Sequence, residues 1–192
     1  MKMLTFWERP KDPSFFFLEL EQRHSSQLVF VKNEKTSLGN LPIGDGWIGE
    51  KKFLKKIVPL IKTADCMPIL LEADTQFAFL HVGYKGLFGG ILEQAFAYFV
   101  PNKMTIGPHI QACCYEVKED FLECYVQEKK NFLFKENKFY FNLSGSVFER
   151  IVNVNERIEI KISPYCTFCS FLKFHSFRRT GHQLRLFHGL YD

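Results

Sequence analysis

The chain has 192 residues, of which 46% are hydrophobic and 24% are charged, and its formal net charge is +4 at pH 7. This length is enough to bury a core within one domain over residues 1–192, and the composition is that of a globular protein. Basic and acidic residues are mixed along the chain, so no basic stripe favours a nucleic-acid partner, and the charges are expected to lie on a solvated surface.

The beginning of the sequence, MKMLTFWERPKDP, contains no long apolar core and is therefore not a secretory signal. No stretch approaches the ~20 consecutive apolar residues of a membrane-spanning helix. Without an export signal, the six cysteines are expected to be reduced thiols in the cytoplasm. The sequence thus predicts a cytoplasmic protein with no nucleic-acid, membrane or obligate protein partner.

Local patterns in the first third of the chain predict three strands and a surface loop. FFFLELEQ (15–22), QLVFVKN (27–33) and KKIVPLIKT (55–63) are rich in the aromatic and branched residues that strands favour. Residues 37–52 hold four of the twelve glycines and are expected to form a loop across the surface.

Two apolar runs in the middle of the chain predict a β-hairpin. MPILLEA (67–73) and FAFLHVG (77–83) are separated by polar residues, and a two-residue turn fits at Asp74 and Thr75. This turn fixes the register of the two strands. A three-residue loop would shift that register and move the side chains to the opposite faces.

The rest of the chain alternates predicted helices with strands. Apolar residues at helical spacing predict a helix that begins near Gly86, and similar patterns predict helices over 115–130 and 143–154. Several neighbouring strands read as hairpins, which favours a mixed-sheet α+β fold over a doubly wound one. No GxGxxG or Walker loop is present. The remaining predicted strands are 103–110, 138–143, 158–165 and 173–179.

The hairpin register brings a cysteine and a histidine together. Pro68 faces His81 in the two-residue register, so Cys66 and His81 share one face as diagonal neighbours, with Cα atoms roughly 7–8 Å apart. The chain then enters the predicted helix, and the N-terminus of a helix favours anions. Lys85 stands at that start and adds a positive charge.

Two kinds of chemistry fit this pair of residues. A Cys66–His81 dyad could act as nucleophile and base in acyl transfer or deamidation. Alternatively, the two side chains could bind Zn²⁺ with one more protein ligand, leaving a position for water as catalytic zinc sites do. The spacing alone does not choose the third ligand among the remaining histidines, which are His24, His109, His175, His182 and His188.

The other cysteines give a weaker signal. Cys166-x-x-Cys169 has the spacing of half a structural zinc site, but such a site normally needs a second pair, and the adjacent Cys113 and Cys114 have the wrong spacing for one. Adjacent cysteines also make a structural disulfide with each other implausible. We therefore expect Cys113, Cys114 and Cys124 to be core residues.

Six short segments occur along the chain in a recognisable order. They are EQRH (21–24), GDG (44–46), TADCMP (63–68), HVGYKG (81–86), IGPHIQACCYEV (106–117) and FHSFRR (174–179). Taken together, they resemble the ordered motifs of a bacterial protein family over residues ~18 to 190, and six blocks in the right order are far more specific than any single motif. That family is described as multicopper polyphenol oxidase or laccase, as purine nucleoside phosphorylase with adenosine deaminase activity, and as peptidoglycan editing factor.

The resemblance implies a fold and a metal centre. The implied fold is a mixed β-sheet sandwich flanked by helices in α/β/β/α layers, similar to the cysteine-hydrolase domain of a deamidating toxin. The implied ligands of Zn²⁺, with copper as the alternative metal, are His24, Cys66 and His81. Asp65 is the fourth implied catalytic residue, as a group that orients a ligand or moves a proton. A turn carboxylate is the structural alternative for Asp65.

The resemblance also implies small-molecule substrates, namely a purine nucleoside and phosphate. Tyr115 and Phe177 are candidates for stacking on the base, with core packing as the alternative, whereas Asp45 and Glu116 match family acids without a definite task. The alternatives at the same site are a peptidoglycan-precursor editing amidase or a Cys/His hydrolase, a copper polyphenol oxidase, and a binding module without catalysis. The implied substrate- and phosphate-binding residues are Lys85, Gly86, Ser176, Arg178 and Arg179.

This chain departs from the family pattern in three places. Lys85 stands where arginine is usual, which keeps the charge but loses the bidentate fork. His24 is not followed by the usual glycine, and the family's N-terminal segment with a TRxGG-like turn is absent or shortened. That segment helps to build the substrate pocket in relatives.

Overall fold

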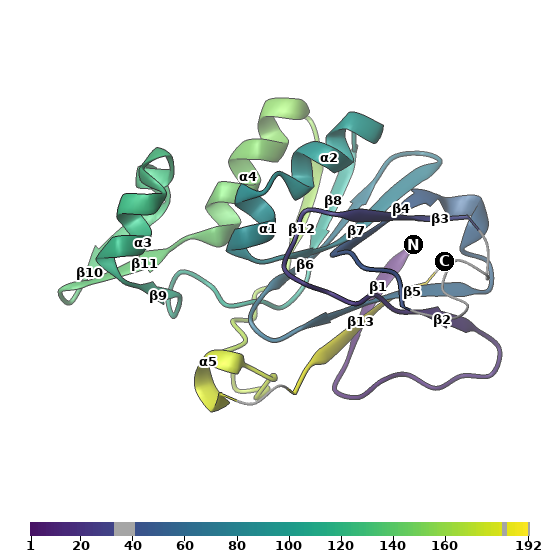
Figure 1. The fold of residues 1–192 in the computed structure, drawn as a ribbon, viewed down its shortest axis with the longest axis horizontal. Helices are drawn as coiled ribbons and strands as arrows, with labels where there is room; N and C mark the ends of the chain where they lie inside the picture. Colours follow the sequence, from purple (N-terminus) through teal and green to yellow (C-terminus); the bar gives the residue numbers. More distant parts are fainter. Residues whose placement is uncertain (33–40, 182–183, 192) are drawn as a thin grey trace.

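The computed structural model describes residues 1–32, 41–181 and 184–191, and its body is a sandwich of two β-sheets with helices against one of them (Figure 1). The larger sheet has six strands in the order β12-β8-β6-β7-β4-β3. Neighbouring strands are antiparallel except for the outer pairs β12–β8 and β3–β4, which are parallel. The strands are β3 (Leu28–Val31), β4 (Gly46–Glu50), β6 (Met67–Glu72), β7 (Gln76–Val82), β8 (Lys103–Ile106) and β12 (Glu159–Ile162).

The central hairpin, β6 and β7, is apolar along its length because both of its faces are covered. Every residue of β6 is buried, as is every residue of β7 after Gln76. Ile69 and Leu80 pack in the core beneath the helices, whereas Leu70 and Phe79 pack in the core between the two sheets. Strands covered on both faces read as continuous apolar runs rather than alternating ones.

The smaller sheet has four strands in the order β1-β13-β5-β2 and packs on the other face of the large sheet. The two sheets are also joined by Trp47, which is fully buried and whose indole N–H donates a 3.0 Å hydrogen bond to the Leu60 carbonyl. The predicted strand 15–22 is confirmed over residues 16–18 and the predicted strand 55–63 over residues 57–63, whereas β1 and β13 were not predicted. The strands are β1 (Lys2–Phe6), β2 (Phe16–Leu18), β5 (Ile57–Thr63) and β13 (Leu186–Tyr191).

The helices α1 (Tyr84–Phe88), α2 (Ile91–Tyr98) and α4 (Leu143–Val154) cover the outer face of the large sheet. The prediction of one helix from Gly86 was wrong in detail. The chain bends into a second helix at Gly90, whose φ of 86° lies in the left-handed region that glycine tolerates. Helix α4 is confirmed over its predicted range.

Three other predictions were wrong. The glycine-rich stretch 37–52 contains β4 and the 3₁₀ turn η2 (Lys51–Phe53), while residues 37–40 lie outside the described residues. The predicted helix 115–130 is divided among several short elements, and the predicted strand 173–179 ends in the one-turn helix α5 (Phe177–Thr180), which extends one residue beyond it. The short elements are β9 (Glu116–Val117), α3 (Glu119–Cys124) and η3 (Val126–Asn131), and the small third sheet also includes β10 (Phe132–Lys135) and β11 (Lys138–Phe141).

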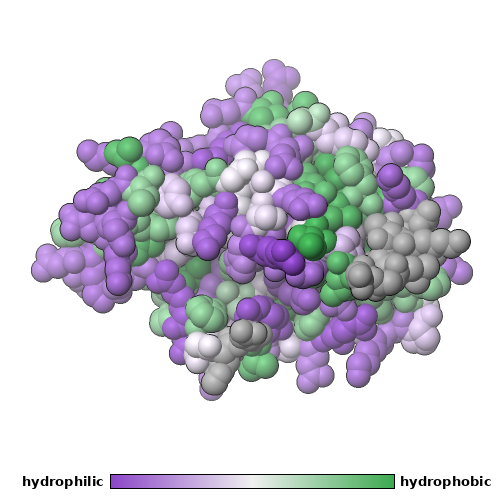
Figure 2. Space-filling model, viewed as in Figure 1, coloured by the Kyte–Doolittle hydropathy of each residue, from purple (hydrophilic) through white to green (hydrophobic). Residues whose placement is uncertain are grey.

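The predicted mixed α+β sandwich is confirmed. Hydrophilic residues dominate the face drawn in Figure 2, with hydrophobic residues showing in smaller groups between them. Among the residues that the structure describes, no helix combines the length and apolar character needed to cross a membrane.

Candidate metal centre and substrate pocket

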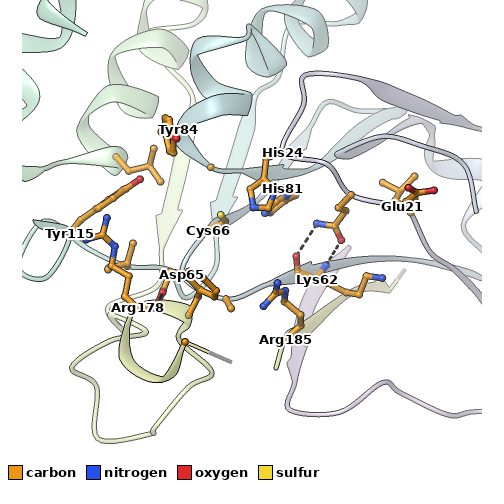
Figure 3. Close-up of a pocket in the computed structure, with 18 of the residues that line it drawn as sticks. Glu21, His24, Lys62, Asp65, Cys66, His81, Tyr84, Tyr115, Arg178 and Arg185 are labelled. Atoms are coloured by element: carbon orange, nitrogen blue, oxygen red, sulfur yellow. Dashed lines mark hydrogen bonds between the residues drawn. The ribbon is translucent and has the colours of Figure 1, made fainter. Parts of the chain in front are cut away.

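Two histidines and one cysteine meet where the central hairpin opens (Figure 3). The predicted register is confirmed, because Pro68 pairs with His81 in the β6–β7 ladder. One ligand atom each of His24, Cys66 and His81 lies within 4.8 Å of the other two. The two imidazole rings lie edge to face, with centroids 4.8 Å apart. The structure thus brings together the three residues that the sequence resemblance indicated as metal ligands.

The carboxylate of Asp45 holds both histidines in place. It is fully buried, and its Oδ1 accepts hydrogen bonds from Nδ1 of His81 at 2.8 Å and from the backbone N–H of His24 at 3.0 Å. With Nδ1 occupied in this way, the Nε2 lone pair of His81 is the one available to a metal. A carboxylate behind a metal-binding histidine fixes the tautomer and orientation of the ring.

Asp45 also holds the turn that carries His24. Its Oδ2 accepts hydrogen bonds from the backbone N–H of Arg23 at 3.1 Å and from the backbone N–H and hydroxyl of Ser25 at 2.6 and 2.7 Å. His24 has a φ of 58°, an unfavourable left-handed conformation for a residue with a side chain. The hydrogen bonds to Asp45 hold the turn in this conformation. Sequence reasoning matched Asp45 to a family acid but found no task for it; its position between two glycines in GDG was the available signal.

The site favours a thiolate beside an imidazolium when no metal is bound. Burial raises the pKa of the Cys66 thiol, but the charge of His81 and hydrogen bonds from His24 and His81 outweigh it and lower this pKa to about 6. Burial lowers the pKa of His81, but the Cys66 charge and Asp45 raise it to about 9. Burial likewise raises the pKa of Asp45, and hydrogen bonds from His81 and Ser25 lower it to about 2.

Gly83 leaves room for the cysteine sulfur. It follows β7 and precedes α1, and a Cβ at this position would lie 3.0 Å from Sγ of Cys66 and 3.5 Å from Cδ2 of His24. A side chain here would therefore press on two of the three candidate ligands.

Asp65 lines the pocket, and its carboxylate also accepts hydrogen bonds that join separate segments of the chain. Its Oδ1 accepts a 2.7 Å hydrogen bond from the Thr167 hydroxyl, and its Oδ2 accepts one from the Ser176 hydroxyl at 3.0 Å and one from the Arg178 backbone N–H at 2.8 Å. These bonds join the strand end that carries Cys66 to the start of α5. The catalytic role of Asp65 remains a prediction.

The five predicted phosphate-binding residues do not gather at one place. Arg178 lines the pocket, but the side chain of Lys85 is exposed on α1, and Gly86 is buried in that helix where it passes close to the Ser25 carbonyl. Ser176 is buried and caps α5. The Arg179 guanidinium donates hydrogen bonds to the carbonyls of residues 167, 168 and 174.

A cavity of about 960 Å³ is lined in part by the three candidate ligands His24, Cys66 and His81. Tyr115 and Arg178 enter it from one side, with the guanidinium 4.9 Å from the tyrosine ring centre, and Lys62 and Arg185 enter from the other side (Figure 3). Sequence reasoning missed Lys62 and Arg185, because neither belongs to a motif. The other lining residues include Leu20, Gln22, Leu41, Tyr84, Ile110, Leu143 and Phe177.

The other histidines do not join this centre within the described residues. His109 is buried between the Gly107 carbonyl and the Ser144 hydroxyl, and burial lowers its pKa to about 4. His188 is buried between two threonine hydroxyls, and burial lowers its pKa to about 3. His175 belongs to no candidate metal group among the described residues, and His182 lies outside those residues.

The three residues fit a zinc ion. Imidazole nitrogen and thiolate sulfur are the donors that Zn²⁺ prefers, and catalytic zinc sites have three protein ligands with a fourth position for water or substrate. In such sites a carboxylate commonly accepts a hydrogen bond from the ligand histidine, as Asp45 does from His81. Among the described residues, only one candidate metal group contains histidine, namely His24, Cys66 and His81. A multi-copper oxidase needs several histidine-rich centres, and the described residues do not form them.

Comparison with known proteins agrees with the motif order. A family model described as multi-copper polyphenol oxidoreductase laccase matches residues 10–188. A Rickettsia prowazekii protein named purine nucleoside phosphorylase is 29% identical over 178 residues, which cover 86% of this chain and 71% of that protein. A Haemophilus influenzae protein of the same name is 31% identical over 142 residues, covering 67% of this chain and 58% of that protein.

One further relative and two solved structures complete the comparison. A protein from an unknown prokaryote, named adenosine deaminase RL5, is 26% identical over 167 residues, covering 72% of this chain and 59% of that protein. The crystal structure of a Neisseria meningitidis protein superimposes with a TM-score of 0.75 at 25% identity, covering 92% of this chain and 75% of that one. The YfiH protein of Bacillus licheniformis gives a TM-score of 0.77 at 23% identity, covering 93% and 75%, and has the same fold.

Proposed function

Since this chain belongs to the multi-copper polyphenol oxidoreductase laccase family, and relatives of it are named purine nucleoside phosphorylases, we propose that it is a zinc-dependent purine nucleoside phosphorylase. The reaction converts adenosine, inosine or guanosine and phosphate into the free base and ribose 1-phosphate. A relative named adenosine deaminase supports a second activity at the same site, the removal of ammonia from adenosine.

The observation that carries the proposal is the convergence of His24, Cys66 and His81 beside a cavity large enough for a nucleoside. These three residues would hold the zinc ion, and Asp45 would keep the His81 ring in its ligand orientation. A bound Zn²⁺ supplies Lewis-acid chemistry, by polarising an oxygen of the substrate or by lowering the pKa of a bound water.

The aromatic residues of the cavity wall suit a purine base. Tyr84, Tyr115 and Phe177 line the cavity, and stacking of a nucleic-acid base on an aromatic side chain contributes roughly 1–3 kcal/mol. In this chain their rings would orient the base, and the apolar residues beside them would keep water away from the glycosidic bond.

The cationic residues of the wall suit phosphate. Lys62, Arg178 and Arg185 line the same cavity, and charge-assisted hydrogen bonds to phosphate are among the strongest that proteins make. In phosphorolysis, a phosphate oxygen forms a bond to C1′ of the ribose while the bond from C1′ to the base breaks and its electron pair leaves with the base. The cations would hold the phosphate against the ribose for this attack.

A second candidate function is a Cys/His hydrolase, including an amidase that edits peptidoglycan precursors. It is favoured by the low pKa of Cys66 and the high pKa of His81, which describe a nucleophilic thiolate beside a protonated imidazole.

We also propose a cytoplasmic location, which the six unpaired cysteines support.

One experiment separates these functions. Bound metal would be measured in the full-length protein, and adenosine would be assayed with and without phosphate for the wild type, Cys66→Ala and the control Cys124→Ala, whose cysteine is exposed on α3. We expect release of adenine that requires phosphate and zinc, is lost in Cys66→Ala and is kept in Cys124→Ala. Stoichiometric copper with oxidation of phenols would overturn the proposal in favour of an oxidase. A metal-free protein whose Cys66 is labelled by a thiol-reactive substrate analogue would favour the hydrolase.

A further inference from the structure

Four cysteines form a second cluster outside the pocket. One sulfur each of Cys113, Cys114, Cys166 and Cys169 lies within 4.8 Å of the other three, and Sγ of Cys113 is 3.8 Å from Sγ of Cys169. The expectation that Cys113 and Cys124 are core residues was wrong, because both are exposed, and Cys114 is half-buried. Two of the four cluster residues, Cys113 and Cys169, are exposed, so apolar packing does not explain why the four thiols meet.

The Cys113–Cys169 sulfur distance of 3.8 Å matches the edge of a tetrahedral metal site, and all four sulfurs lie within 4.8 Å of one another. Four thiolates bound to one Zn²⁺ at about 2.3 Å occupy the corners of a tetrahedron, whose edges are then about 3.8 Å long. A disulfide between Cys113 and Cys169 would need the sulfurs to approach to about 2.05 Å and would leave the other two thiols without a role. A single thiolate-bound metal ion accounts for all four sulfurs.

The backbone holds the two halves of the cluster together. The cysteines lie in the segments that follow β8 and β12, which are parallel neighbours in the large sheet. The ladder continues past the strand ends, because His109 and Cys166 form a β-bridge and the Thr167 N–H donates a 3.0 Å hydrogen bond to the His109 carbonyl. The cluster therefore stands on a paired scaffold and not on two independent loops.

The Cys166-x-x-Cys169 segment has the hydrogen bonds of a metal-binding turn. The backbone N–H of Gln111 donates a 3.5 Å hydrogen bond to Sγ of Cys166. The Ser170 N–H closes the turn on the Cys166 carbonyl at 3.0 Å. An amide N–H directed at a sulfur stabilises its negative charge, as hydrogen bonds to the ligands of metal sites do.

We propose that Cys113, Cys114, Cys166 and Cys169 bind a second zinc ion, in a structural site with four cysteine ligands. The spacing rule that argued against this site assumes two C-x-x-C pairs. Here the adjacent Cys113 and Cys114 lie in a turn closed by the Cys114 N–H on the Gln111 carbonyl at 2.9 Å, and their sulfurs still reach the other pair.

The site has a consequence for the pocket. Cys114 precedes Tyr115, which lines the cavity, and Cys166 precedes Thr167, whose hydroxyl holds the carboxylate of Asp65. A metal ion that joins the two segments would fix one wall of the cavity without contacting the substrate. The four cysteines would bind this ion whichever reaction the pocket performs.

The test is a metal count on the full-length protein with matched variants. We expect two zinc ions per wild-type chain and one in Cys113→Ser and Cys169→Ser. One zinc ion is also expected in Cys66→Ala, which loses the other centre, and two in the control Cys124→Ser. After removal of metal with a chelator, Co²⁺ added to Cys66→Ala should give the intense sulfur-to-cobalt charge-transfer absorption of a tetrahedral thiolate site.

The cobalt measurement keeps the proposal falsifiable even if a serine variant fails to fold, since Cys66→Ala leaves the four-cysteine cluster intact. The proposal is overturned if Cys66→Ala binds no zinc and shows no thiolate–cobalt absorption. It is equally overturned if the intact mass shows the loss of two hydrogens and peptide mapping finds a Cys113–Cys169 disulfide.

Discussion

Replacement of Asp45 by asparagine tests how the proposed metal centre is held together. The carboxylate receives hydrogen bonds on both oxygens, from the backbone N–H groups of Arg23, His24 and Ser25, the Ser25 hydroxyl and the His81 ring. In the aspartate, Oδ1 accepts from two donors and Oδ2 from three. An asparagine side chain keeps one acceptor oxygen and places an NH₂ donor where the other oxygen was. Whichever way the amide is oriented, at least two buried donors lose their acceptor.

The magnitude follows from these contacts. A buried donor without a partner costs about 1–3 kcal/mol, so two of them cost at least about 2 kcal/mol. Against the effect of burial, the same hydrogen bonds from His81 and Ser25 lower the pKa of Asp45 from 3.8 to about 2, which corresponds to about 2.4 kcal/mol in favour of the folded, ionised state, at 1.36 kcal/mol for each unit of pKa. We expect Asp45→Asn to lower the free energy of unfolding by about 3 kcal/mol and zinc affinity by about 10–100-fold.

The measurements are urea unfolding and zinc competition against a chelating dye. Since the folded-state pKa lies below the unfolded one, the stabilisation by Asp45 is present above pH 3.8 and is lost as the pH falls through about 2. The control is Ser25→Ala, which removes one hydroxyl donor, should cost about 1 kcal/mol and should leave zinc affinity unchanged. A folded Asp45→Asn protein with wild-type zinc affinity would refute the idea that this carboxylate orients His81.

Three further predictions concern the pocket and its centre. Gly83→Ala should weaken zinc binding with little change in the unfolding transition, because the new Cβ would lie 3.0 Å from Sγ of Cys66. Competition with a chelator measures the zinc affinity. An unaltered zinc affinity would show that the sulfur moves freely. In zinc-free protein, the rate at which iodoacetamide alkylates Cys66 should rise with pH with a midpoint near pH 6, since the thiolate prevails above the pKa of the thiol. In His81→Gln this midpoint should move to higher pH. A wild-type midpoint near pH 9 would contradict the ion pair between Cys66 and His81. Arg178→Ala should raise the KM for phosphate at least several-fold, because Arg178 lines the cavity. Arg179→Ala should leave that KM unchanged and lower the unfolding free energy by about 1–3 kcal/mol, because the Arg179 guanidinium binds backbone carbonyls. Steady-state kinetics and urea unfolding measure the two effects, and the reverse pattern would contradict this assignment.

The parts of the fold that were predictable are those fixed by local patterns. The β6–β7 hairpin follows from two apolar runs and a short polar turn, and its register alone placed Cys66 beside His81. Helix α4 follows from apolar spacing together with Asn142, whose side chain caps it by accepting a hydrogen bond from the Gly145 N–H at 3.0 Å. In both cases the determining residues are close together in the sequence.

The missed parts depend on contacts between distant segments. Strand β1 pairs with β13, and β4 lies in a glycine-rich stretch that becomes a strand because β3 and β7 flank it. The role of Asp45 needs the turn at His24 to fold onto it, and the cysteine cluster needs β8 and β12 to be neighbours. Neither requirement is visible in a local pattern.

The position of β13 between β1 and β5 bears on the order in which the molecule assembles. The Thr5–His188 hydrogen bond spans 183 positions, whereas the hairpin that joins Cys66 to His81 closes over a turn of a few residues. Because long loops close more slowly than short ones, the hairpin should form early and the four-stranded sheet late. Arg185, directly before β13, would then reach the cavity wall last, so a nascent metal centre would precede a complete substrate pocket during folding.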